Sequence, residues 1–183
     1  MPFPAKHYVP ALKLKAAEKD ALSVLAPSVK KGITPLLQVV ENPQSKPLQK
    51  HIETAFKKIE GAVSGLARYF IDPVEIADSG KNGADLTFKK CSGLSVPYTP
   101  VAGPSRPVDL TLAALQAVNR TGLAVRITRK EFESGTLASS VSKFLATHSL
   151  NPASLDLIVD LGAVDSMIAD GVVALTEAFL AAV

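Results

Sequence analysis

Residues 33–72 contain one complete strand–helix–strand unit, with the sequence ITPLLQVVENPQSKPLQKHIETAFKKIEGAVSGLARYFID. Residues 33–40 are almost all apolar, as expected of a parallel strand that is buried on both faces. In residues 48–63 an apolar side chain recurs every three or four positions, which predicts an amphipathic helix. Residues 66–72 form a second apolar run that ends at an Asp-Pro step, where a strand is expected to stop. This order predicts a βαβ unit with parallel strands.

The same alternation extends in both directions along the chain of 183 residues. Strands are expected at residues 8–15, 33–40, 66–72, 94–101, 123–128 and 155–161. Helices are expected at residues 16–25, 48–63, 84–91, 108–118, 136–147 and 165–180. The fourth strand carries Pro97 and Pro100, which predicts an edge or bulged strand.

Six strand–helix units predict an α/β fold with a parallel sheet and right-handed crossovers. The arrangement is TIM-barrel-like but two units short of the usual eight, so we expect a partial or truncated barrel. Residues 1–183 are therefore expected to form a single βα-repeat domain that is incomplete at its C-terminal end. Missing units would leave an exposed sheet edge, which predicts self-association.

Composition excludes several classes of protein. Hydrophobic residues make up 47% of the chain and charged residues 20%, which is typical of a folded, water-soluble protein. The net charge of +3 is mild and the basic residues are interleaved with acidic ones, which argues against nucleic-acid binding. The apolar stretch at residues 171–183 contains Glu177 and is too short to span a membrane. The single cysteine, Cys91, forms no internal disulfide, so a cytoplasmic location is expected.

Candidate site residues lie toward the carboxyl ends of the expected strands, where parallel βα folds place their sites. They are Lys13, Lys15, Gln38, Asp72, Arg126, Asp156 and Asp160. A charge on an otherwise apolar parallel strand is costly unless it is paired, which is the physical reason to single these residues out. We expect Lys13, Asp72, Arg126 and Asp160 to converge in one polar cluster.

Two interpretations of these residues remain open. In the first, Lys15, Gln38, Arg126 and Asp156 bind an anionic ligand such as a phosphate or carboxylate, while three residues are catalytic, namely Lys13, Asp72 and Asp160. In this interpretation the aspartates act as acid and base or hold a divalent metal. In the second, the charges pair with one another and fix the strand register.

Other motifs add little chemistry. The three histidines lie on different elements at no metal-ligand spacing, and His51, beside Lys50, is expected to be solvated. Arg129-Lys130-Glu131 is expected to be a solvated loop or an addition to an anion patch. The chain has no nucleotide-binding glycine motif and no nucleophile elbow, so the sequence favours no particular cofactor or reaction.

Several short motifs carry a family resemblance. They are Tyr8-Val9-Pro10-Ala11-Leu12-Lys13-Leu14-Lys15, Glu18, Ala21-Leu22, Ile33-Thr34-Pro35-Leu36-Leu37, and Leu155-Asp156-Leu157-Ile158-Val159-Asp160-Leu161-Gly162. In this order they resemble the phage-type beta protein family, whose members are longer, so that this chain would match their N-terminal half to two thirds. Two positions depart from the family pattern. Gln38 stands where the family often has Glu, unless Glu41 substitutes for it, and Ala17 stands where it has Gly.

The resemblance implies no particular activity and leaves two functional hypotheses. One is a barrel domain that binds an anionic or phosphorylated ligand at the carboxyl ends of its strands. The other is a non-catalytic binding or regulatory scaffold of phage or mobile-element origin. The missing acid at Gln38 favours the second hypothesis.

Overall fold

A computed structural model describes residues 7–42 and 46–162 of the chain. The chain divides into two compact units, which are described separately. The first unit comprises the residues up to Ala102 together with Arg106–Ala124. The second unit comprises Gly103–Ser105 and the residues from Val125 onward. The helix expected at residues 165–180 lies outside the described residues.

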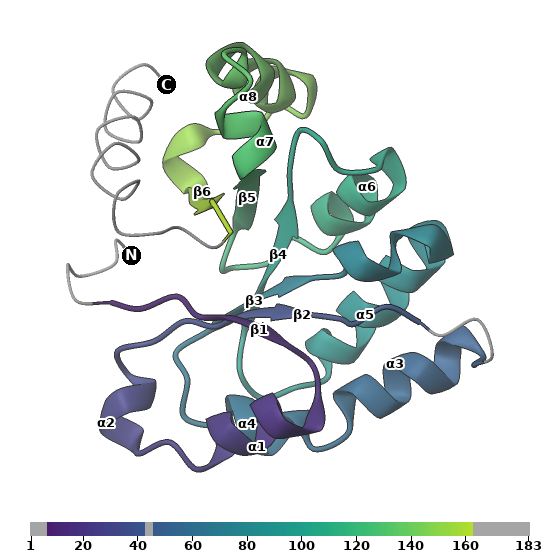
Figure 1. Ribbon diagram of the computed structural model, residues 1–183, viewed down its shortest axis with the longest axis vertical. Helices are drawn as coiled ribbons and strands as arrows, with labels where there is room; N and C mark the ends of the chain where they lie inside the picture. Colours follow the sequence, from purple (N-terminus) through teal and green to yellow (C-terminus); the bar gives the residue numbers. More distant parts are fainter. Residues whose placement is uncertain (1–6, 43–45, 163–183) are drawn as a thin grey trace. The chain divides into compact units, whose positions relative to one another are not determined.

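Strands and helices alternate as the sequence predicts (Figure 1). The strands are β1 Ala11–Lys13, β2 Leu36–Gln38, β3 Tyr69–Asp72, β4 Tyr98–Ala102, β5 Leu123–Thr128 and β6 Leu155–Asp160. The helices are α1 Ala16–Ser23, α2 Pro27–Lys30, α3 Leu48–Phe56, α4 Ile59–Val63, α5 Gly80–Ser92, α6 Val108–Gln116, α7 Arg129–Phe132 and α8 Leu137–Thr147. Two 3-10 helices, η1 Val74–Ser79 and η2 Pro152–Ser154, complete the described part.

The six strands form one parallel sheet in the order β1-β2-β3-β4-β5-β6, which confirms the α/β fold class. Each strand therefore neighbours the next one in the sequence. This is the order of a β/α barrel, whereas a doubly wound sheet reverses its strand order near the middle. A sequential order places the carboxyl ends of successive strands next to one another, which is what a site at strand ends requires.

Both units have an apolar core. In the first unit every residue of β3 and β4 is buried, and so are Ile52, Phe88 and Ala113 of the helices. The described core of the second unit joins Val125 and Ile127 of β5 to buried side chains of α8, which are Leu137, Val141, Phe144 and Leu145. The strands are short, so the helices supply much of the buried surface.

The prediction of a single helix at residues 48–63 is wrong, because the structure has two helices there. The helical segment breaks between Lys57 and Lys58, and Lys58 has a left-handed backbone with φ of 63°. The buried ammonium group of Lys19 donates to the carbonyl oxygens of Ala55, at 2.7 Å, and of Lys57, at 2.8 Å. These carbonyls lie where the helix stops, so a lysine from α1 satisfies groups that a continuing helix would otherwise use.

The prediction of an edge or bulged fourth strand is also wrong. β4 lies between β3 and β5 in the strand order, and Pro100 pairs in regular register with Ile71. Proline removes only one N–H from the ladder, and the remaining groups of β4 find other partners. The carbonyl oxygen of Tyr98 accepts from the side-chain amide of Asn119, at 2.9 Å, and from the hydroxyl of Thr121.

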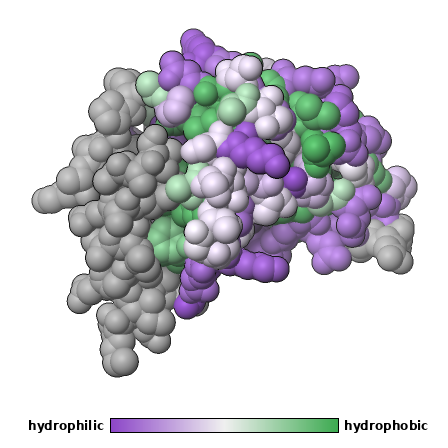
Figure 2. All heavy atoms as spheres, turned by 90° about the horizontal axis from the view of Figure 1, so that it is seen from above, coloured by the Kyte–Doolittle hydropathy of each residue, from purple (hydrophilic) through white to green (hydrophobic). Residues whose placement is uncertain are grey.

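Exposed apolar side chains are present on α6, where Val108 and Leu112 face solvent. Figure 2 shows hydrophobic residues interrupted by hydrophilic ones on the face that it presents. Within residues 7–42 and 46–162, no helix has the length and hydropathy needed to cross a membrane.

Candidate functional site

Three candidate residues form a row across the first unit. Lys13 is in register with Gln38, and Gln38 is in register with Asp72, so that the last residues of β1, β2 and β3 lie side by side. The row exists because the strands are parallel and end at the same level. The row thus includes Lys13 and Asp72 of the expected cluster, together with the candidate binding residue Gln38.

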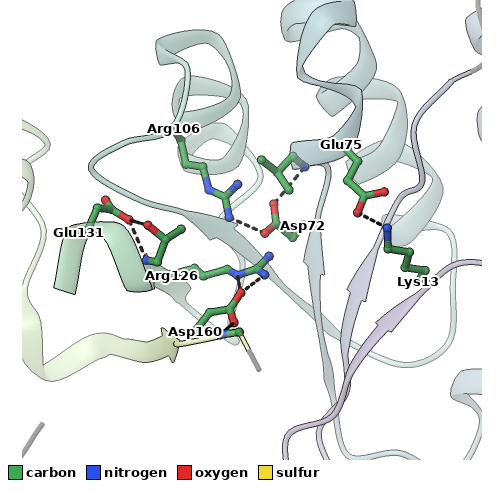
Figure 3. A network of polar contacts seen from close by, with 10 residues as sticks. Lys13, Asp72, Glu75, Arg106, Arg126, Glu131 and Asp160 are labelled. Atoms are coloured by element: carbon green, nitrogen blue, oxygen red, sulfur yellow. Dashed lines mark hydrogen bonds and ion pairs between the residues drawn. The ribbon is translucent and has the colours of Figure 1, made fainter. Parts of the chain in front are cut away.

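Asp72 is the most buried member of the row, with 1% of its side chain exposed. Its Oδ2 atom lies 2.7 Å from Nη2 of Arg106, whose side chain is 8% exposed (Figure 3). Its Oδ1 atom accepts a hydrogen bond from the backbone N–H of Val74, at 3.1 Å. Asp72 thus has a charged partner for one oxygen and a backbone partner for the other, as a buried carboxylate requires.

Sequence reasoning did not identify Arg106. It lies in the loop that follows β4, between Ser105 and Pro107, and has no periodic pattern around it. The available signal was its position, since loops after strands carry site residues in βα folds.

Lys13 pairs with Glu75 of η1, with Nζ and Oε1 2.7 Å apart. The pair is partly solvated, because 46% of the Lys13 side chain and 26% of the Glu75 side chain are exposed. Glu75 is a second residue that sequence reasoning missed. It follows β3 after only two residues, so that the chain turning out of the strand brings a carboxylate to the end of β1.

The other half of the predicted cluster belongs to the second unit. The buried guanidinium of Arg126 on β5 donates through Nε and Nη2 to Oδ2 of Asp160 at the end of β6 (Figure 3). The other oxygen of Asp160 accepts from the backbone N–H of Gly162, at 3.0 Å. Asp156 is half-buried on the same strand. Each of the four predicted cluster residues therefore takes part in an ion pair. In the first unit Lys13 pairs with Glu75 and Asp72 pairs with Arg106, whereas in the second unit Arg126 and Asp160 pair with each other.

A cavity of about 520 Å³ opens just past the ends of β1 and β2, and we call it the β1–β2 cavity. Leu14 and Lys15, which follow β1, line it together with Val40 and Glu41, which follow β2. Its lysines are Lys15, Lys19, Lys46, Lys57 and Lys58, and its carboxylates are Asp20 and Glu41. Five lysines against two carboxylates make the lining basic.

The charged residues of this lining differ in their exposure. Lys15 is exposed, whereas burial lowers the pKa of Lys19, a shift that Asp20 opposes and Lys58 assists. Glu41 lines the cavity three residues after Gln38, so an acid is present near the position where the family pattern has one. The five lysines come from three separate segments of the sequence, and only Lys15 was among the predicted binding residues.

The expectation that His51 is solvated is wrong. His51 lines the β1–β2 cavity, is 6% exposed, and lies with Nε2 2.8 Å from the carbonyl oxygen of Val40. The histidine faces inward because it lies one turn before the core residue Ala55 of α3 and next to the buried Ile52. Its ring fixes the start of α3 to the chain that leaves β2.

The described residues contain no group of three or more histidine, cysteine, aspartate or glutamate side chains arranged to hold a metal. Neither the curated proteins nor the solved structures include a match to the chain. A scan against protein families, in contrast, matches residues 8–183 to the family described as Beta protein. This match includes the row of strand ends and the β1–β2 cavity, and it agrees with the motifs around Lys13 and Asp160. The chain therefore belongs to the Beta protein family.

Proposed function

We propose that the chain binds an anionic, phosphorylated ligand in the β1–β2 cavity, at the carboxyl ends of its first strands. One observation carries the proposal, which is that five lysines and only two carboxylates line a cavity of about 520 Å³ at this position. Volumes of about 300–1,000 Å³ are typical of small-molecule sites. Parallel βα folds place their ligands at this edge of the sheet.

The lysines differ in what they contribute. Lys15 is exposed at the start of α1, so its ammonium group is accessible to a ligand in the cavity that it lines. Lys19 donates to the carbonyl oxygens of Ala55 and Lys57 and holds α1 against the end of α3. Lysine is a compact point charge that suits phosphate oxygens. We therefore assign ligand binding to Lys15 and a positioning role to Lys19.

A second candidate function, a binding or regulatory scaffold without catalysis, is favoured by the ion pairs. Lys13, Asp72 and Asp160, the residues expected to be catalytic, each have a partner of opposite charge. An acid or base must be able to exchange a proton with a ligand, and Asp72 is almost completely buried against Arg106. The pairing therefore supports binding at the lysines over chemistry at the aspartates.

We also propose that both units belong to one βα-repeat domain and that the protein is of phage or mobile-element origin. The family match over residues 8–183 supports the first point, because it spans both units. The resemblance of the motifs around Lys13 supports the second.

The proposal is tested by isothermal titration calorimetry with ADP and with inorganic pyrophosphate at constant ionic strength. The variant is Lys15→Ala, and the matched control is Lys81→Ala, which removes a lysine of the same unit whose exposed pair with Asp85 lies outside the cavity. We expect Lys15→Ala to weaken binding about tenfold or more, which corresponds to about 1.4 kcal/mol. The control should bind within about twofold of the wild type. Equal losses in both variants would show a general charge effect and contradict the proposal.

A further inference from the structure

The second unit has a cavity of its own, of about 570 Å³, which we call the α7–α8 cavity. Every residue that lines it belongs to the second unit, and none of them lines the β1–β2 cavity. It lies between the turn that leaves β5, the short helix α7, and one side of α8 from its first turn to its end. The candidate residues Arg126, Asp156 and Asp160 do not line it.

Hydroxyl groups dominate the polar part of this lining. Six of the lining residues carry one, namely Ser105, Thr128, Ser134, Thr136, Ser140 and Thr147. A hydroxyl both donates and accepts hydrogen bonds, so a row of them matches a ligand that itself carries hydroxyl groups. Leu137 and Phe144, both buried, supply an apolar wall against which the C–H face of a sugar ring can pack.

Two lysines give the cavity its charge. Lys130 of α7 and Lys143 of α8 are exposed and line it. They come from different helices, so the charges approach the cavity from two elements. The first turn of α8 also borders the cavity, and the macrodipole of this 11-residue helix adds a favourable field for an anion there.

The one carboxylate of the lining is already engaged by the protein. Glu131 accepts from the backbone N–H of Thr128, at 2.8 Å, and from its hydroxyl, at 2.7 Å (Figure 3). It also accepts from the backbone N–H of Ser105, at 3.1 Å. These bonds form a capping box at the start of α7 and join it to the loop after β4. Glu131 therefore shapes the wall, and its charge is directed at N–H and O–H donors of the chain.

We infer that the α7–α8 cavity is a binding site for a sugar phosphate, with Lys130 and Lys143 on the phosphate. The hydroxyl groups for the sugar are those of Ser105, Ser140 and Thr147, because the Thr128 hydroxyl belongs to the capping box and those of Ser134 and Thr136 bond to each other. The inference is independent of the function proposed for the β1–β2 cavity, because the two cavities share no residue. The phosphate alone and the sugar alone each use only part of the lining. A sugar phosphate uses the hydroxyls, the apolar wall and both lysines together.

The test uses the full chain and titrates it with ribose 5-phosphate, with ribose and with inorganic phosphate at constant ionic strength. Binding is followed by calorimetry and by ¹H–¹⁵N spectra. We expect ribose 5-phosphate to bind at least tenfold more tightly than either fragment and to shift the resonances of residues 128–148. Equal affinity for inorganic phosphate would mean that any anion is accepted and would overturn the sugar-phosphate assignment. No binding at millimolar concentration would overturn the site itself.

Variants test whether ribose 5-phosphate binds in the α7–α8 cavity. Lys143→Ala should weaken ribose 5-phosphate binding at least tenfold. Arg129→Ala is the matched control, because it removes a positive charge next to Lys130 from a side chain that pairs with Glu133 and does not line the cavity. The control should bind within twofold of the wild type. A loss with Lys15→Ala and none with Lys143→Ala would place the ligand in the first unit and refute the inference.

Discussion

Replacing Asp72 with asparagine is expected to lower the free energy of unfolding by about 3–5 kcal/mol, the usual cost of removing one partner of a buried ion pair. The magnitude follows from exposure, because 1% of the Asp72 side chain and 8% of the Arg106 side chain reach solvent. Asparagine keeps an oxygen that can accept from the Val74 N–H, so the substitution removes the charge and little else. Arg106 is then left buried without its carboxylate.

Two further variants test whether the loss of stability depends on the solvent exposure of the ion pair. Lys13→Ala breaks a pair that is 46% and 26% exposed, and exposed pairs contribute only about 0.2–1 kcal/mol. Asp160→Asn removes the partner of Arg126, but the Asp160 side chain is 31% exposed, so water replaces part of the interaction. We expect a loss of about 1.5–3 kcal/mol for that variant, as for other hydrogen bonds to charged groups.

The assay is urea denaturation followed by far-ultraviolet circular dichroism, because the chain contains no tryptophan to report by fluorescence. The double variant Asp72→Asn with Arg106→Met should recover part of the loss, since it removes the buried guanidinium together with the carboxylate. Two results would refute the reasoning. Either Asp72→Asn lies within about 1 kcal/mol of the wild type, or Lys13→Ala costs as much as Asp72→Asn.

Three further predictions concern Lys19, Glu131 and Cys91. Lys19→Met leaves two helix-end carbonyls without their donor, so urea denaturation should show a loss of about 1–3 kcal/mol. Burial opposes ionisation of Glu131, but hydrogen bonds from Thr128 and Ser105 outweigh it and hold its pKa below the usual 4.5. Its charge therefore stabilises the fold above pH 4.5, and the stability difference between wild type and Glu131→Gln should shrink as the pH falls through the lowered pKa. Burial raises the pKa of Cys91 to about 12, so roughly one thiol in ten thousand is ionised at pH 8, and a disulfide reagent should label it only after unfolding.

The elements that the sequence predicted best are those whose pattern is set by burial alone. The bounds of β5, Leu123–Thr128, are those expected, because four of its six residues are apolar and a charged segment follows it at Arg129. The starts of α1, α3 and α6 also agree with expectation. The end of α3 does not, because Lys19, some 36 residues away in the sequence, supplies the hydrogen bonds that end it. A local pattern carries no information about such a partner.

In the candidate site, too, the features that depend on burial alone were predicted and the partners supplied by distant segments were not. The cost of an unpaired charge on an apolar strand correctly indicated that Asp72, Arg126 and Asp160 have partners, because that cost depends only on burial. The identity of a partner depends on the path of the loops. Arg106 and Glu75 lie in irregular segments after β4 and β3, so no period marks them. The lysines of the β1–β2 cavity likewise come from three separate segments that only the fold brings together.

The ion pairs and the cavity lysines perform different tasks, and the difference can be measured. A lysine can hold a phosphate in a fixed place only if the loop that carries it is itself fixed, and the row from Lys13 to Asp72 fixes the strand that leads into Lys15. On this argument Asp72→Asn should reduce stability with little change in the intrinsic affinity for ADP, whereas Lys15→Ala should reduce affinity with little change in stability. The contrary result would be that Asp72→Asn abolishes ligand binding and leaves the unfolding curve unchanged. The buried aspartate would then contact the ligand itself, and the strand-end aspartates would again be the candidates for catalysis.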